Sequence, residues 1–154
     1  MKRTFSSVTK IVAPREVVWR VMTDHVRYAR WGRAKTVTME RTGSPDPNGV
    51  GAIRVFHAGP SRVREEVVVY EPPVRMAYRL VSGLPVRDYR SEMVLEVDRD
   101  VTVLSWSSSF EPRIPFTGGM FTRLMARAVD GFAAGIKRES EQEASAGTAA
   151  GGRA

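Results

Sequence analysis

The sequence contains no cysteine, which excludes disulfide bonds, thiolate catalysis and cysteine-ligated metal sites. Histidine, another common metal ligand and catalytic base, occurs only as His25 and His57. These two do not stand at a metal-ligand spacing, so we expect surface or helix-packing residues rather than ligands or bases. The sequence therefore predicts no metal site and no cofactor.

Long hydrophobic runs are also missing. No stretch reaches the run of about 18 apolar residues that a membrane-spanning helix needs, and residues 1–7 are not followed by the apolar segment of a secretory signal. A chain of 154 residues with 42% hydrophobic content suits one domain with a packed core. We expect a single domain over residues 1–143, located in the cytoplasm. Residues 144–154, rich in Ala and Gly, lack apolar bulk and are expected to be disordered.

Familiar catalytic motifs are scarce as well. The serines form no Gly-x-Ser-x-Gly nucleophile elbow. Residues 49–51 (GVG) lack the spacing and the following helix of a phosphate-binding loop. Any catalysis would therefore have to come from residues that line a cavity.

Positive charge is abundant, but lysine occurs only at Lys2, Lys10, Lys35 and Lys137. The formal net charge is +7, and the arginines that supply it are spread along the chain among Asp and Glu. No basic block, aromatic-plus-basic RNA motif or helix-turn-helix spacing is present. We therefore expect a solvated basic surface and no nucleic-acid partner. An interaction module for an acidic partner or a membrane surface stays as one alternative.

Most of the chain up to residue 111 has the composition and period of β-strands. Strands are predicted at residues 3–12, 35–42, 51–57, 62–71, 75–82, 86–98 and 101–111. The connections at 83–85 and 98–100 are short enough to require antiparallel hairpins. Two short helices are predicted between the first two strands, one behind Pro14 and one after Asp24, and Gly32 closes the second.

A long amphipathic helix is predicted over residues 115–143. Apolar side chains recur there at the i, i+3, i+4, i+7 spacing of one helix face, while charged side chains take the other face. The apolar face comprises Phe121, Leu124, Met125, Ala128, Val129, Phe132 and Ile136. Gly131 and Gly135 on this helix indicate either a close approach between helix and sheet or room for a guest molecule.

In this order, the elements and several short motifs resemble the SRPBCC or START-like (helix-grip) superfamily, and within it the polyketide cyclase/dehydrase-type branch. The motifs are residues 11–19 (IVAPREVVW), 28–31 (YARW), 49–51 (GVG), 64–67 (REEV), 70–73 (YEPP) and 102–106 (TVLSW). Ala29 departs from the pattern, which usually has proline there. The resemblance implies an α+β helix-grip fold, with a curved antiparallel sheet of about seven strands around the long C-terminal helix. It also implies a cavity between sheet and helix for an apolar or aromatic ligand.

Strand parity selects the side chains that would line such a cavity, because residues on one face alternate along each strand. In the simplest registers, one inward row across four strands consists of Val67, Tyr78, Tyr89 and Phe110. The neighbouring inward row consists of Glu65, Leu80 and Arg87. A buried charge is costly unless it is paired or faces water, so Glu65 and Arg87 are either polar anchors for a ligand or a salt bridge at the rim. The candidate ligand-binding residues are Trp31, Glu65, Val67, Tyr78, Leu80, Arg87, Tyr89, Met93, Trp106, Phe110, Phe121, Leu124 and Ala128.

The sequence leaves three functions open. The first is binding of a hydrophobic small molecule, such as a lipid, a quinone or an aromatic polyketide. The second, implied by the family resemblance, is a polyketide cyclase or aromatase with Glu65, Arg87 and Tyr89 as candidate catalytic residues on a poly-β-keto substrate. The third is the basic interaction module. Whether the chain is a monomer or a homodimer stays open.

Overall fold

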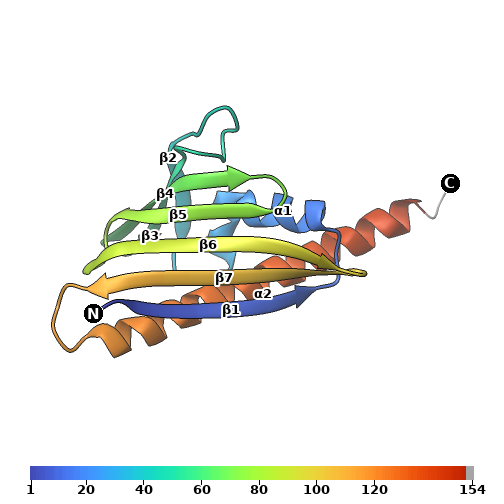
Figure 1. The fold of residues 1–154 in the computed structure, drawn as a ribbon. Coiled ribbons are helices and arrows are strands. Elements are labelled where there is room, and N and C mark those ends of the chain that lie inside the picture. Colours follow the sequence, from blue (N-terminus) through green and yellow to red (C-terminus); the bar gives the residue numbers. More distant parts are fainter. Residues whose placement is uncertain (152–154) are drawn as a thin grey trace.

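The computed structural model describes residues 1–151, in which a curved antiparallel sheet wraps around one long helix (Figure 1). The seven strands lie in the order β1-β7-β6-β5-β4-β3-β2. Their bounds are β1 Arg3–Ile11, β2 Thr36–Arg41, β3 Ile53–Ala58, β4 Ser61–Glu71, β5 Arg75–Ser82, β6 Val86–Asp98 and β7 Val101–Pro112. The predicted helix-grip fold is confirmed. Because β1 pairs with β7, the first and last strands of the chain are neighbours in the sheet.

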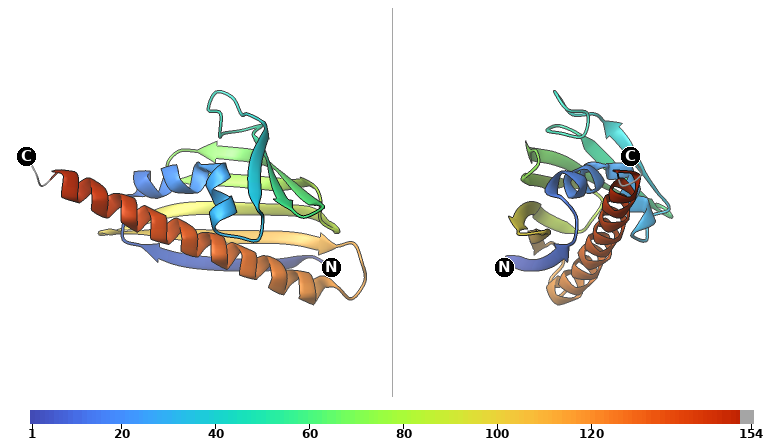
Figure 2. Two further views of the ribbon diagram at one scale, coloured as in Figure 1. Left: turned by 180° about the vertical axis from the view of Figure 1, so that it is seen from behind. Right: turned by 90° about the vertical axis from the view of Figure 1, so that its right-hand side faces the viewer.

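Two short helices follow β1, as the sequence predicts. Helix α1 (Arg15–Thr23) begins directly after Pro14, whose carbonyl oxygen accepts hydrogen bonds from the backbone amides of Val17 and Val18. The second is a 3-10 helix, η1 (His25–Arg30). Asp24 separates the two, but its carboxylate pairs with Arg27 instead of capping a backbone amide. Both helices lie on the concave side of the sheet (Figure 2).

Helix α2 (Gly118–Gly151) crosses the concave side of the sheet diagonally (Figure 2). It continues beyond Glu143, so the expected disorder of residues 144–154 is wrong for 144–151; residues 152–154 lie outside the described residues. Three features favour the longer helix. Alanine has the highest helix propensity, no proline interrupts the segment, and Ala144 still packs against the core.

The face that α2 turns to the core differs from the predicted one. Its buried apolar side chains are centred on Met125, Val129 and Ile136, whereas Leu124 and Ala128 are exposed. The predicted buried face of α2 was too wide, because helical periodicity cannot tell which edge of a broad apolar stripe meets solvent. No helix within residues 1–151 has both the length and the apolar character needed to cross a membrane.

Candidate functional site

Aromatic side chains dominate the space between α2 and the sheet. Tyr78, Tyr89, Trp106 and Phe110 project inward from β5, β6 and β7, and neighbouring ring centroids lie 6.4 to 6.5 Å apart. On the other side, Tyr28 and Phe56 pack edge to face, with centroids 6.3 Å apart. Strand alternation positions most of these rings, because every second residue faces α2.

Phe132 of α2 joins the two aromatic groups. Its ring stacks on Trp106 with a centroid separation of 6.2 Å, and it contacts Tyr28 at 5.2 Å and Phe56 at 5.9 Å. These are ordinary packing distances for aromatic pairs. Phe132 therefore fills the middle of the interior, and a ligand at this level would have to displace its ring.

A buried ion pair borders the aromatic interior. Nε of Arg54 donates to one carboxylate oxygen of Glu65 at 2.9 Å, and Nη2 lies at an ion-pair distance of 2.9 Å from the same oxygen. Arg54 is only 1% exposed, and its guanidinium carbon lies 4.4 Å from the ring centre of Tyr28 and 4.5 Å from that of Tyr78. Burial raises the pKa of the Glu65 carboxyl, although Arg54 opposes the shift. The interior thus holds a charged pair whose guanidinium lies against two tyrosine rings.

His25 completes this polar group. Its Nε2 lies 2.9 Å from the Asn48 carbonyl oxygen, and its Nδ1 lies 3.3 Å from Nη1 of Arg54. Because a carbonyl only accepts, Nε2 carries the proton and Nδ1 accepts from Arg54. Burial, together with the Arg54 charge, lowers the pKa of His25 to about 3. His25 is therefore a buried neutral imidazole, in contrast to a surface residue.

Arg87 does not join Glu65, which corrects the predicted row. In β6 the stretch from Arg87 to Arg90 faces only Glu111 to Ser109 in β7, so β6 carries one extra residue. This bulge reverses the alternation, and Arg87 becomes exposed. The partner of Glu65 is Arg54, its direct neighbour on β3. The tight turn between β3 and β4 contains the signal for this pair, since pairing Ala58 with Ser61 brings residues 54 and 65 opposite each other.

The other predicted registers are partly right. Val67 lies opposite Tyr78 and Glu65 opposite Leu80. Tyr78, however, lies opposite Ser91 rather than Tyr89, a shift of two residues that leaves Tyr89 on the inward face. Parity is therefore more robust than exact pairing, because an even shift keeps a side chain on its face.

Trp106 carries a polar atom that the interior leaves without a partner. The side chain is 1% exposed, and among the described residues its indole Nε1 finds no acceptor. A buried donor without an acceptor costs about 1–3 kcal/mol. The phenols nearby stay protonated, because burial raises the pKa of Tyr78 well above its ordinary value and also raises that of Tyr89, whose hydroxyl oxygen accepts from Ser91 at 3.1 Å.

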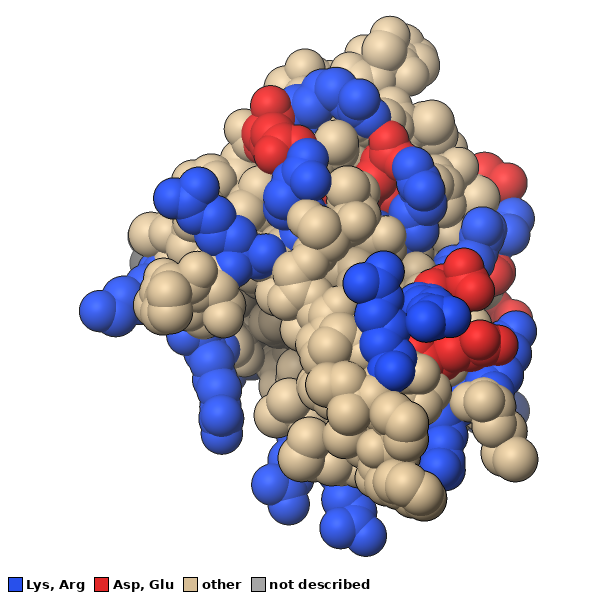
Figure 3. Space-filling model, turned by 90° about the vertical axis from the view of Figure 1, so that its left-hand side faces the viewer, with Lys and Arg blue, Asp and Glu red and all other residues tan. Residues whose placement is uncertain are grey.

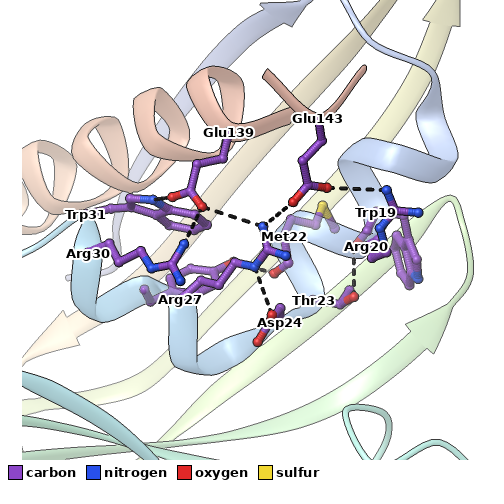
Figure 4. Close-up of polar contacts among 11 residues, drawn as sticks. Trp19, Arg20, Met22, Thr23, Asp24, Arg27, Arg30, Trp31, Glu139 and Glu143 are labelled. Atoms are coloured by element: carbon purple, nitrogen blue, oxygen red, sulfur yellow. Dashed lines mark hydrogen bonds and ion pairs between the residues drawn. The ribbon is translucent and has the colours of Figure 1, made fainter. Parts of the chain in front are cut away.

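An ion-pair network fastens the C-terminal half of α2 to α1 and η1 (Figure 4). Glu143 accepts from Arg27 at 2.8 Å and from Arg20 at 3.3 Å, while Glu139 accepts from Arg30 at 2.8 Å. The indole N–H of Trp31 also donates to Glu139. We call this set, Arg20, Arg27, Arg30, Trp31, Glu139 and Glu143, the α2 clamp.

Gly135 allows α2 to approach Trp31 closely. A Cβ atom at this position would overlap the indole ring of Trp31, so only glycine fits. Gly131 faces the carbonyl oxygen of Trp31, to which a Cβ atom would lie 3.2 Å away. Of the two predictions for these glycines, the close approach is right, although the approaching element is the segment after η1 rather than the sheet.

Most of the predicted ligand-binding residues lie in or beside the interior. Leu80 and Phe121 are partly buried, while Arg87, Leu124 and Ala128 are exposed and fall outside it. The buried members are Trp31, Glu65, Val67, Tyr78, Tyr89, Met93, Trp106 and Phe110. Sequence reasoning missed Arg54 and the buried role of His25, whereas Phe132 was expected only as part of the apolar face of the helix.

Two surface clefts lie away from this interior. One, of about 740 Å³, is formed by the start of α1, the β6–β7 turn and the last turns of α2. The other, of about 410 Å³, lies along β1, β6 and β7 and contains Arg90, Glu92 and several serines. Within residues 1–151 no cluster of three His, Asp or Glu side chains is arranged to hold a metal ion.

The family comparison agrees with this architecture. A family model described as polyketide cyclase / dehydrase and lipid transport matches residues 2–141. The chain belongs to this family. The resemblance noted in the sequence is therefore confirmed. A search of curated protein sequences finds no match.

Similar solved structures share the family's fold. Norcoclaurine synthase from Thalictrum flavum, a point mutant with a transition-state analogue, has a TM-score of 0.75 at 13% identity, covering 93% of this chain and 96% of that one. The Zhui aromatase/cyclase from a Streptomyces species has a TM-score of 0.74 at 16% identity, with coverages of 92% and 95%. A START superfamily protein from Mycobacterium smegmatis has a TM-score of 0.70 at 17% identity, with coverages of 90% and 97%. At these identities the likeness concerns the fold.

Proposed function

We propose that this protein binds a hydrophobic small molecule with a hydrogen-bond acceptor in the interior between α2 and the sheet. The observation that carries the proposal is the buried indole N–H of Trp106, which has no acceptor among the described residues although aromatic rings surround it. A ligand carbonyl at Nε1 would remove the cost of the unpaired donor. The rings of Tyr78 and Phe132 supply apolar contact on either side.

The chemistry of the interior favours one group of ligands. Aromatic faces suit planar or extended apolar molecules, and a single free donor selects compounds with a carbonyl or a similar acceptor. Quinones, aromatic polyketides and lipids with an ester or ketone group all meet both conditions. The family description, polyketide cyclase / dehydrase and lipid transport, supports the same classes.

The Phe132 side chain blocks this site. Its ring occupies the centre of the interior, so binding requires rotation of the side chain or a shift of α2. Phe132→Ala would leave an open cavity in its place and is expected to increase affinity, because the ligand then displaces no side chain.

Equilibrium dialysis with menadione, a small naphthoquinone, tests the proposal against 2-methylnaphthalene, which has the same rings without carbonyls. We expect menadione to bind more tightly, and Trp106→Phe to weaken menadione by about tenfold while leaving the hydrocarbon unchanged. Phe132→Ala should bind both compounds more tightly. Equal loss of both ligands in Trp106→Phe, or no binding even by Phe132→Ala, would refute the proposal.

A second function, cyclisation of a poly-β-keto substrate, is supported by the buried Arg54 and Glu65 pair. We propose that Glu65 would take the α-proton of a bound β-ketone while the Arg54 guanidinium stabilises the enolate oxygen. Raising the pKa of Glu65 by burial makes it a stronger base than an exposed carboxylate.

Turnover of an aromatising poly-β-keto substrate, followed by absorbance, tests this second function. Glu65→Gln and Arg54→Met should each abolish turnover, whereas Arg87→Ala, which removes an exposed arginine, should leave it unchanged. Turnover that survives Glu65→Gln would exclude this mechanism and leave binding as the function.

A further inference from the structure

Large apolar side chains are exposed where β7 leads into α2. Ile114 is 49% exposed, Phe116 105%, Met120 60% and Leu124 46%. Together with Arg113, Arg123 and Arg127 we call these residues the α2 entrance surface. They lie at the end of the molecule that also holds the N-terminus, far from the C-terminal end of α2 (Figure 1). Apolar side chains grouped on a surface in this way mark an interaction site.

Phe116 is the most prominent member. Its φ angle is 65°, a left-handed conformation that bulky residues rarely adopt. The ring is fully exposed, so the described part of the chain provides no burial that would offset the strained backbone. Backbone strain of this kind clusters at functional sites, such as those that contact a ligand or a partner.

Helical spacing arranges the rest of the surface. Met120, Arg123, Leu124 and Arg127 follow the i, i+3, i+4, i+7 pattern, so they form one exposed stripe along the first turns of α2. Each apolar side chain in this stripe stands next to an arginine. Long arginine side chains can place their charge at the level of lipid headgroups while the neighbouring apolar groups insert more deeply.

The charge around this surface has one sign. Residues 112–129 contain three arginines and no carboxylate, and the guanidinium of Arg3 lies close to Gly118. The nearest acidic residues along the chain are Glu111, which lies opposite Arg87, and Asp130. Figure 3 shows this end of the molecule, with Lys and Arg projecting over its lower half and the acidic residues confined to the upper and right parts.

We propose that the α2 entrance surface docks on a lipid bilayer that contains anionic lipids. Four apolar side chains provide insertion into the headgroup boundary, and the arginines provide attraction to negative headgroups. This inference goes beyond the proposed ligand binding and does not rest on it, since the docking residues lie on the outside and the Trp106 site inside.

Other occupants fit the surface less well. A second copy of the chain would face arginine with arginine across a two-fold axis, because such an interface uses the same patch on both subunits. A nucleic acid would satisfy the arginines but would gain little from Ile114, Met120 and Leu124. An anionic bilayer matches both the apolar and the cationic part.

Vesicle co-sedimentation of the full chain tests the proposal. The vesicles are phosphatidylcholine alone or phosphatidylcholine with about 30% phosphatidylglycerol, without added ligand. We expect binding to the anionic vesicles only, weakened about tenfold by Phe116→Ser and several-fold by Leu124→Gln. Val97→Ser is the matched control, because Val97 is 56% exposed at the opposite end of the sheet and should not matter.

Electrostatics supply a second readout. Binding should weaken several-fold between about 50 and about 300 mM NaCl, and Arg123→Gln with Arg127→Gln should reduce that salt dependence. Equal binding to neutral vesicles, or Phe116→Ser and Leu124→Gln both behaving as Val97→Ser, would overturn the proposal. A concentration-dependent dimer that Phe116→Ser abolishes would also overturn it, since a second copy would then cover the surface. Menadione dialysis on Phe116→Ser reports separately on the interior.

Discussion

His25 makes the stability of this protein sensitive to acid. Burial and the adjacent Arg54 charge lower its pKa from the ordinary value of 6.5 to about 3, so the folded state keeps the ring neutral while the unfolded chain protonates it. The contribution of the neutral His25 ring to stability is therefore fully present above about pH 6.5 and is lost as the pH falls towards 3. Between about pH 7.5 and about pH 5, we expect a loss of about 2 kcal/mol in the free energy of unfolding.

Urea unfolding at a series of pH values measures this loss. His25→Gln removes the titrating ring, so its stability, although lower at neutral pH, should fall by about 2 kcal/mol less over the same interval. Both proteins keep the other titrating groups, including Glu65 with its raised pKa, so the difference between the two curves isolates the histidine contribution. NMR gives a direct check, because in His57→Gln the ring of His25 is the single imidazole.

We expect the His25 ring to keep the signature of a neutral Nε2–H tautomer down to about pH 5. A midpoint near the ordinary value in the folded state would refute it. Equal slopes of stability against pH for the wild type and His25→Gln would do the same, since no other change separates the two proteins in this interval.

Two further predictions concern the interior and the α2 clamp. Arg54→Met should cost about 3–5 kcal/mol in urea unfolding by leaving Glu65 buried without a partner, and adding Glu65→Leu should recover most of this loss; equal stability of the single and double variants would contradict the assigned pair. Gly135→Ala should lower stability by about 1–3 kcal/mol because its methyl group overlaps Trp31, whereas Gly147→Ala, which has open space around it, should be neutral or slightly stabilising. Similar thermal midpoints for these two glycine variants would argue against the close contact.

Local patterns predict the fold well. Strand alternation identifies the inward position of Tyr78, Met93 and Trp106, and the short turns require antiparallel neighbours. These features depend on nearest neighbours in the chain, which is why the sequence carries them. The family resemblance adds the placement of the long helix against the concave side.

The candidate site is harder to predict, because it depends on small departures from regular structure. One extra residue in β6 turns Arg87 outward, and no composition signal marks that bulge. Arg54 stands in a strand of buried residues, where a charged side chain would not be sought without its cross-strand partner Glu65. The orientation of α2, which exposes Leu124, follows from tertiary packing rather than from helical periodicity.

The α2 clamp has a consequence for how the domain opens. Within the described residues, the ion pairs that tie α2 to other elements involve Glu139 and Glu143, whereas residues 118–131 meet the sheet through apolar contacts such as Met125 and Val129. Ion pairs with defined geometry hold a helix in one position, while apolar contacts lack direction and tolerate sliding. The helix is thus held in place near Glu139 and is less restrained near Gly118. Local opening would separate helix and sheet first near Gly118, and amide exchange along α2 should slow from its first turns towards Glu139.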